Sequence, residues 1–211
     1  TVIYTLSLLD ALPISLKGAW DGIRLVLFGV LSTGRDAAGA LTFGFNPTNI
    51  GNMLFRATPL ILTGVAVAVA FKTGLFNIGA AGQYCIGAAL SLYAALGLGW
   101  SWLPCMLLAI LGGALLAGIS GLLKSYCNVN EVISGIMLNW IVLYLTNMLL
   151  TLVKEDASPY TKVLANTNAS AVLPSLGLGA LFNKNQYVGL AIPLSVLMAI
   201  LVWVVLEKTK I

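Results

Sequence analysis

The chain has 211 residues, of which 59% are hydrophobic and only 9% are charged, and its mean hydropathy is +0.98. Soluble domains carry about 25% charged residues, so these values exclude an ordinary soluble protein and indicate an integral membrane protein. The formal charge of +4 does not indicate nucleic-acid binding, because the Lys and Arg residues are scattered singly along the chain. Long apolar runs predict an all-α fold, since the strands of a membrane barrel would alternate polar and apolar residues.

The beginning of the chain differs in character from the rest. No basic region precedes the apolar part of residues 1–15, which argues against a signal peptide. The string resembles translated sequencing adapter, and we interpret it as a non-native leader; the alternative is the damaged end of a first membrane helix. Residues 16–56 predict a region of short helix and loop, with a short or broken helix over residues 17–31 and a glycine-rich loop after it.

About five transmembrane helices are expected in residues 57–211. The first, residues 57–71, would be about 22 Å long, too short for a bilayer core of about 30 Å, so residues 73–83 would form a broken segment that supplies some of the depth. Non-helical backbone is tolerated in a bilayer only where protein or a water-filled cavity satisfies its amides, so this segment indicates the lining of a path. The other four helices are predicted at residues 84–98, 103–123, 132–153 and 187–206.

Two amide side chains lie in the predicted broken segment, Asn77 and Gln83. Together with free backbone amides, they would bind a polar, uncharged solute, which makes both of them candidates for a substrate pathway. The structural alternative for Asn77 is the N-cap of the following helix, a position that asparagine favours.

One face of the predicted helix at residues 132–153 is polar. Polar groups at membrane depth are costly unless they are paired or hydrated, so this face is a second candidate for the pathway. For Ser134 and Asn139 the alternative is a hydrogen bond to a neighbouring helix, and Trp140 would either stack on a ring or anchor its helix. The polar face consists of Glu131, Ser134, Gly135, Asn139 and Thr146.

Small residues recur every four positions in the predicted helix at residues 103–123. Gly113, Ala117 and Gly121 have the spacing that lets two membrane helices approach closely, and we interpret them as helix-packing residues. Lysines in or near the short loops indicate orientation: Lys72, Lys124, Lys208 and Lys210 fall on one side if the helices alternate, and the positive-inside rule makes that side cytoplasmic.

The sequence lacks the groups that catalysis would need. It contains no histidine, and no two carboxylates fall within one predicted intramembrane site, so we expect no catalytic residue and no enzyme. The three cysteines, Cys85, Cys105 and Cys127, are isolated, which argues against a zinc site or a disulfide and favours buried small hydrophobes. The nearest approach to a phosphate-binding loop has Leu123 where glycine is required, so we expect no ATP bound by this chain.

Two strings carry a resemblance to a known family: ATPLILTGVAVAVAFKTGLFNIGAAGQ at residues 57–83 and NEVISGIMLNW at residues 130–140. They resemble the permease subunit of bacterial ABC importers for nucleosides and related simple sugars, in the superfamily that includes the ribose and branched-chain amino-acid permeases. The resemblance implies a multi-pass protein of the bacterial cytoplasmic membrane with three kinds of partner. These are a second permease subunit, cytoplasmic ATPase subunits that hold ATP and magnesium, and an extracellular substrate-binding lipoprotein.

Two departures from the family accompany the resemblance. The family usually reads GAEGQ where this chain reads GAAGQ, so Ala81 replaces an acidic residue. Family members also continue beyond the helix that ends at Glu207, into the cytoplasmic loop that docks the ATPase and further helices. We therefore interpret residues 57–211 as a partial permease domain whose C-terminal part is missing.

The leading functional hypothesis is a permease that carries nucleosides or related sugars, powered by ATP hydrolysis in partner subunits. One alternative is a non-conducting membrane scaffold or assembly subunit that binds its neighbours through small residues. The other is an ion-coupled secondary carrier. It is disfavoured because Glu131, the acidic residue near a membrane stripe, lies at a helix end.

Overall fold

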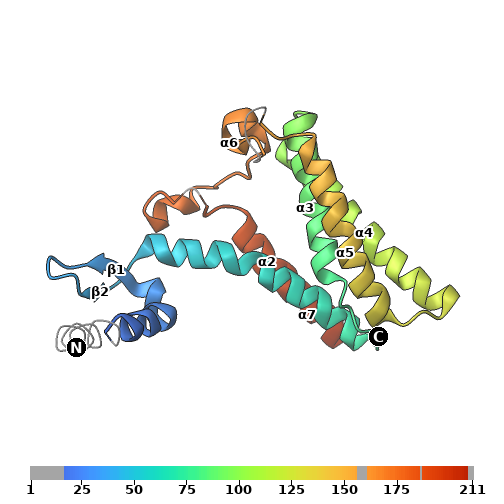
Figure 1. Cartoon of the computed structure of the whole chain (residues 1–211), viewed down its shortest axis with the longest axis horizontal. Coiled ribbons are helices and arrows are strands. Elements are labelled where there is room, and N and C mark those ends of the chain that lie inside the picture. Colours follow the sequence, from blue (N-terminus) through green and yellow to red (C-terminus); the bar gives the residue numbers. More distant parts are fainter. Residues whose placement is uncertain (1–16, 156–160, 186, 209–211) are drawn as a thin grey trace, which may run out of the picture. The chain divides into compact units, whose positions relative to one another are not determined.

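The computed structural model of the protein describes residues 17–155, 161–185 and 187–208, so the predicted leader lies outside the described residues. Most of the described chain is helical, which confirms the all-α membrane fold (Figure 1). A helix over residues 17–28 comes first. The later elements are η1 (Gly29–Leu31), β1 (Ser32–Arg35), β2 (Leu41–Phe43), α2 (Pro47–Lys72), α3 (Ala80–Gly97), α4 (Trp102–Cys127), α5 (Glu131–Thr151), α6 (Leu164–Thr167), η2 (Ala169–Ala171), η3 (Leu178–Phe182) and α7 (Ala191–Lys208).

The chain divides into two compact units. One contains the residues up to 57 together with 175–189, and the other contains residues 58–174 and those from 190 onward. The first part of α2 belongs to one unit and the remainder to the other.

In the first unit a β-hairpin stands where the sequence predicted a loop. Strands β1 and β2 pair antiparallel, with Arg35 opposite Leu41. The turn forms because the Asp36 carboxylate accepts hydrogen bonds from the backbone N–H groups of Ala38 and Ala40, at 3.0 and 2.8 Å. Aspartate favours such turns because its short side chain reaches backbone donors two and more residues ahead.

The first membrane helix begins ten residues earlier than predicted. Asn46 accepts a hydrogen bond from the N–H of Asn49 at 3.2 Å, which is an N-cap contact, and Pro47 follows at the first helical position, where its missing N–H costs nothing. Helix α2 therefore has 26 residues and a length of about 39 Å, enough to cross the bilayer core without help. The prediction of a short first span was wrong because this start signal was overlooked.

Four helices of the described chain, α2, α4, α5 and α7, are long and apolar enough to cross a membrane. The remaining predicted span, α3, is helical over Ala80–Gly97 and packs against both α4 and α5 (Figure 1). Its buried residues include three alanines and two glycines. A helix covered by protein on several sides needs small residues for close packing more than it needs large apolar ones.

A small hydrophobic core lies where α3 ends and α4 begins, within the group of α3, α4 and α5. Ala94 and Ala95 of α3 pack with Cys105 of α4. The Asn168 side-chain amide donates to the carbonyls of Ala95 and Trp100 at 2.9 and 2.8 Å, which ties the segment after α5 to the α3–α4 turn. The prediction of buried cysteines is confirmed for Cys105 but wrong for Cys127, which is exposed at the end of α4; Cys85 is half-buried.

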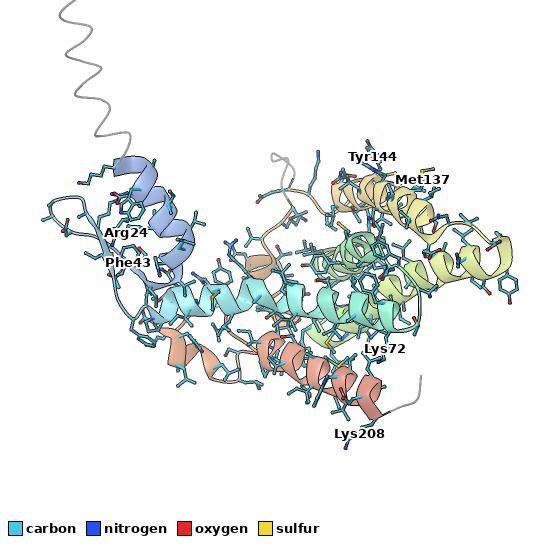
Figure 2. All side chains as sticks on the ribbon, turned by 90° about the horizontal axis from the view of Figure 1, so that it is seen from below. Arg24, Phe43, Lys72, Met137, Tyr144 and Lys208 are labelled. Carbon is cyan, nitrogen blue, oxygen red and sulfur yellow. The ribbon has the colours of Figure 1, made fainter. Side chains whose placement is uncertain are left out.

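Basic residues end three of the long helices. Lys124 lies in the last turn of α4, and Lys72 and Lys208 lie in the last turns of α2 and α7 (Figure 2). These positions suit a cation twice over, because the C-terminal end of a helix carries partial negative charge and because lysine lies favourably at a membrane boundary.

One buried asparagine fastens the segment before α7 to the start of α2 within the first unit. The Asn185 amide donates to the Thr48 carbonyl at 3.1 Å and to the Asn52 side chain at 2.9 Å, and it accepts from the Tyr187 N–H at 2.9 Å. Only 8% of Asn185 is exposed.

We expect Asn185→Ala to loosen this contact, because each lost hydrogen bond leaves a shielded polar group unpaired. A cost of about 2 kcal/mol would raise amide hydrogen exchange in residues 48–52 and 187–189 about 30-fold. Asn183→Gly is the matched control: Asn183 is exposed, makes one 3.3 Å contact, and has a φ of +56° that glycine adopts freely. Equal exchange in the two variants would contradict the assigned role of Asn185.

Candidate substrate-pathway site

The connection between α2 and α3 is short and irregular. It covers residues 73–79 and turns at Gly74, whose φ is +77°. The break is therefore shorter than the predicted segment at residues 73–83, and Gln83 lies in the first turns of α3. The backbone groups freed by this break need partners inside the protein.

Asn139 of α5 supplies two of those partners. Its side-chain nitrogen donates to the carbonyl of Ile78 at 3.1 Å, and its side-chain oxygen accepts from the N–H of Gly82 at 2.8 Å. The Gly82 N–H belongs to the first turn of α3, where backbone donors have no partner within the helix. Asn139 thus fastens the break to α5, which is the structural alternative that the sequence left open.

Three glycines allow this contact by bringing α3 and α5 close together. A Cβ atom on Gly82 would lie 2.7 Å from Oδ1 of Asn139, and one on Gly135 would lie 3.0 Å from the backbone nitrogen of Gly79. Sequence reasoning did not single out Gly79 and Gly82. The available signal was the spacing of Gly135 and Asn139, four residues apart on one face of α5.

Asn77 and Gln83 bind one another. Nδ2 of Asn77 donates to Oε1 of Gln83 at 3.1 Å, and Nε2 of Gln83 donates to Oδ1 of Asn77 at 3.2 Å. The structural alternative for Asn77, an N-cap of α3, is not found, since Gly79 is the N-cap residue and no side chain caps the helix. We call these two residues the amide pair.

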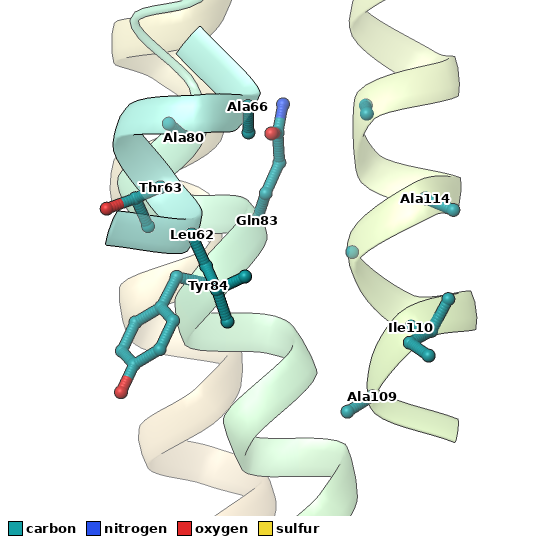
Figure 3. A pocket seen from close by; sticks show the side chains of 11 residues that line it. Leu62, Thr63, Ala66, Ala80, Gln83, Tyr84, Ala109, Ile110 and Ala114 are labelled. Carbon is teal, nitrogen blue, oxygen red and sulfur yellow. The ribbon is translucent and has the colours of Figure 1, made fainter. Parts of the chain in front are cut away.

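Two cavities adjoin the amide pair. The smaller, of about 180 Å³, is lined by Asn77 and Gln83 together with groups of α4, among them Ser120 and Lys124. The larger, of about 430 Å³, lies between α2, α3 and α4 and is lined mainly by apolar side chains, with Gln83 extending into it (Figure 3). Gln83 therefore borders both cavities.

An ion pair lies at the edge of the smaller cavity. Nζ of Lys124, at the end of α4, is 2.7 Å from a carboxylate oxygen of Glu131, at the start of α5. The connection between them is shaped by Asn128, whose φ of +51° ends α4, and by Asn130, whose side chain accepts from the Val132 N–H at 2.9 Å and caps α5. The charges of Lys124 and Glu131 thus neutralise one another beside the cavity.

The remaining candidates of α5 are not brought to the cavities. Ser134 is 5% exposed and donates to the Glu131 carbonyl at 3.2 Å, and Thr146 is 4% exposed and donates to the Leu143 carbonyl at 3.0 Å. Ser134, Gly135 and Thr146 of the polar face are thus buried, and the two hydroxyl groups donate to carbonyls of their own helix. Trp140 is 58% exposed and lines neither cavity.

The family is decided by a sequence match. The profile described as "Branched-chain amino acid transport system / permease component" matches residues 49–211, which is more than three quarters of the chain. The chain belongs to this permease family. It is accordingly a multi-pass protein of the cytoplasmic membrane, with the four apolar spans described above.

Curated relatives of the permease are named for nucleosides and for a sugar. It is 35% identical to the guanosine ABC transporter permease protein NupP of Bacillus subtilis (strain 168) over 164 residues, 76% of this chain and 46% of that protein. It is 33% identical over 208 residues to the glucose ABC transporter permease protein TsgB13 of Haloferax volcanii, 92% of this chain and 53% of that one. For the nucleoside ABC transporter permease protein NupB of Lactococcus lactis subsp. cremoris the identity is 33% over 158 residues, 62% and 43% of the two chains.

The permease chain spans about half the length of the curated relatives it matches. No solved structure matches it.

The predicted helix-packing residues of α4, Gly113, Ala117 and Gly121, make little close contact within the described chain. Gly113 approaches α3, where a Cβ would lie 3.4 Å from the Gln83 carbonyl, whereas Gly121 has nothing within 4 Å. Ala117 lines both cavities. The tight approach of α3 and α4 is made instead by Gly87 and Gly112.

Ala81, where the resemblance leads us to expect an acidic residue, is exposed in the first turn of α3. A carboxylate there would interact favourably with the partial positive charge of the helix N-terminus, by about 0.3–1 kcal/mol. Alanine loses that contribution, while the hydrogen bonds of Asn139 to the break remain in place.

No group of three or more metal-ligating side chains occurs within the residues that the structure covers.

Proposed function

We propose that this chain is the permease subunit of an ABC importer that carries nucleosides or related simple sugars into the cell. The observation that carries the proposal is the amide pair at the α2–α3 break, uncharged polar groups held beside cavities among membrane helices. Amides suit a neutral polar solute because they offer donors and acceptors without the cost of a buried charge.

The relatives support the same solute classes, since the names of three of them specify guanosine, nucleosides and glucose. In this proposal the chain pairs with a second permease subunit and receives solute from an extracellular binding lipoprotein. Cytoplasmic ATPase subunits bind ATP and magnesium, and their hydrolysis cycle alternates access to the solute path. The permease chain itself carries out no chemical step.

The ion-coupled alternative requires an acidic group that gains and loses a proton or sodium ion. Glu131 is the acidic residue among those that line the two cavities at the amide pair, and its carboxylate is paired with Lys124 at 2.7 Å. The scaffold alternative predicts no solute flux at all, so a transport measurement separates it from the permease.

The test is uptake of tritiated nucleosides and glucose into proteoliposomes that hold the complete transporter. We expect uptake that depends on ATP and falls about tenfold with Gln83→Leu, the size expected for loss of one hydrogen-bonding group from a path. Asn147→Leu, an exposed amide on α5 that lines neither cavity, is the control and should leave uptake unchanged. Absence of ATP-dependent uptake with every solute would refute the proposal.

A further inference from the structure

We propose that the side-chain amide of Gln83 recognises the base of a nucleoside, and that Asn77 occupies that amide when no solute is bound. This inference rests on the proposed function and goes beyond it, because it assigns a recognition residue and separates nucleosides from simple sugars as the solute class.

The first support is the difference in hydrogen-bond partners among the side-chain amides of Asn77, Gln83 and Asn139. The Asn139 side chain uses its donor and its acceptor to bond backbone atoms of the break. Breaking these hydrogen bonds would leave the backbone groups unpaired and would cost free energy. Asn77 and Gln83 spend theirs on each other, and among the described residues their side-chain hydrogen bonds join no other group. The structure of the break is thus maintained by one amide, while two remain available for exchange.

The second support is the geometry of the pair. Its two hydrogen bonds, of 3.1 and 3.2 Å, close a ring in which each amide presents a donor and an acceptor side by side. A solute with an adjacent donor and acceptor on a planar edge replaces Asn77 without leaving any group of Gln83 unpaired. Such an exchange conserves the number of hydrogen bonds that Gln83 makes, and the released amide of Asn77 exchanges its two for hydrogen bonds to water.

Nucleobases carry that edge. Purines and pyrimidines place an N–H donor beside a carbonyl or ring-nitrogen acceptor, and glutamine is a well-known bidentate partner of adenine. Neighbouring sugar hydroxyl groups can also bind an amide in two places, but each must give up rotation about its C–O bond to do so. A base edge has its donor and acceptor already fixed in one plane, so it is the better match.

The third support is the space around Gln83. The depression of about 430 Å³ beside Gln83 is open on one side and has room for a planar ring, and its walls are mostly apolar. Figure 3 shows the Gln83 side chain extending from α3 between α2 and α4. Asn77 lies on the smaller cavity and does not line the larger one. Gln83 therefore borders both spaces, whereas Asn77 borders the smaller one and binds the Gln83 amide.

The charged groups nearby are Lys124 and Glu131, and they are paired with each other at 2.7 Å. The site thus offers no unpaired charge and favours a neutral solute, a nucleoside rather than a nucleotide.

The experiment measures direct binding to the full chain in lipid nanodiscs, without any soluble binding protein, by saturation-transfer NMR titration. The probes are inosine, 1-methylinosine and ribose. Hypoxanthine has a single N–H donor within its paired edge, and methylation at N1 removes it while retaining the ring and the sugar. We expect inosine to bind about tenfold more tightly than 1-methylinosine, the size expected for one lost hydrogen bond, and ribose to bind more weakly still.

Two variants give results of opposite sign. Gln83→Met retains the length of the side chain but has no amide, and it should weaken inosine binding about tenfold. Asn77→Ala removes the competing partner of Gln83, and it should tighten inosine binding about threefold or more. A purely structural role for the pair predicts weaker binding in both variants, so that outcome would overturn the inference, as would equal binding of inosine and 1-methylinosine by the unaltered chain.

This outcome is distinguishable from failure of the proposed function. Inosine binding in nanodiscs with no ATP-dependent uptake in proteoliposomes would contradict the importer. ATP-dependent uptake with no preference for inosine over 1-methylinosine or ribose in nanodiscs would retain the importer and refute the role of Gln83.

Discussion

Replacing Asn139 with leucine should lower the melting temperature of the permease by several degrees. The variant loses the hydrogen bonds to the Ile78 carbonyl and the Gly82 N–H, and both backbone groups are then left without their partner beside the break. Inter-helix hydrogen bonds of side chains in membranes contribute roughly 0.6–1.7 kcal/mol, and an unpaired shielded group costs about as much again, so we expect a loss of about 1–3 kcal/mol. Fluorescence-detected size-exclusion chromatography after heating would measure it.

Two further variants show whether hydrogen bonding is the cause. Asn147→Leu makes the same chemical change at an exposed site on the same helix and should leave the melting temperature unchanged. Asn139→Asp retains an acceptor for the Gly82 N–H but loses the donor to Ile78, so it should fall between the wild type and Asn139→Leu. If Asn139→Leu and Asn147→Leu had the same melting temperature, Asn139 would not be the group that fastens the break.

Gly87→Val should be the most damaging single change in the three-helix group. A Cβ atom at Gly87 would lie 2.8 Å from the backbone oxygen of Ala109, and backbone, unlike a side-chain tip, cannot rotate away. Helices α3 and α4 would have to separate. Overpacking a close contact costs about 1–3 kcal/mol, occasionally more, which outweighs the small gain in helix propensity of valine over glycine.

The matched control is Gly118→Val on α4. A Cβ there has nothing within 4 Å, so this variant makes the same change in helix propensity without the clash. We expect Gly87→Val to reduce the monodisperse fraction and the melting temperature, and Gly118→Val to resemble the wild type. Similar behaviour of the two variants would show that α3 and α4 do not meet at Gly87.

The first membrane helix illustrates a signal that was present but overlooked. Asn46 and Pro47 form a helix start that can be recognised from sequence, as an N-cap residue followed by proline at the first helical position. The prediction instead began the span at residue 57 and judged it too short. The hairpin of β1 and β2 is a different case, because strands of three and four residues contain too few positions for an alternating pattern to stand out.

The site illustrates what spacing alone does not decide. Asn77, Gln83 and Asn139 were all recognised as polar groups at membrane depth, and for Asn139 the sequence allowed either a pathway or a contact with a neighbouring helix. In the structure, Asn139 bonds to the backbone of the break, because Gly79, Gly82 and Gly135 let α5 approach it. Asn77 bonds to Gln83. The substrate role of the amide pair stays a prediction.

The amino-acid sequence by itself determined the solvent in which this protein folds, its helical class and its family. Those properties follow from summed hydropathy, from runs of apolar residues and from two long motifs, none of which depends on what lies across a contact. Only the tertiary structure decided that Asn139 bonds to the backbone of the break and that Asn77 and Gln83 bond to each other. An asparagine in a membrane helix has the same donors and acceptors in either role, and the difference lies in the partner that packing brings within hydrogen-bonding distance.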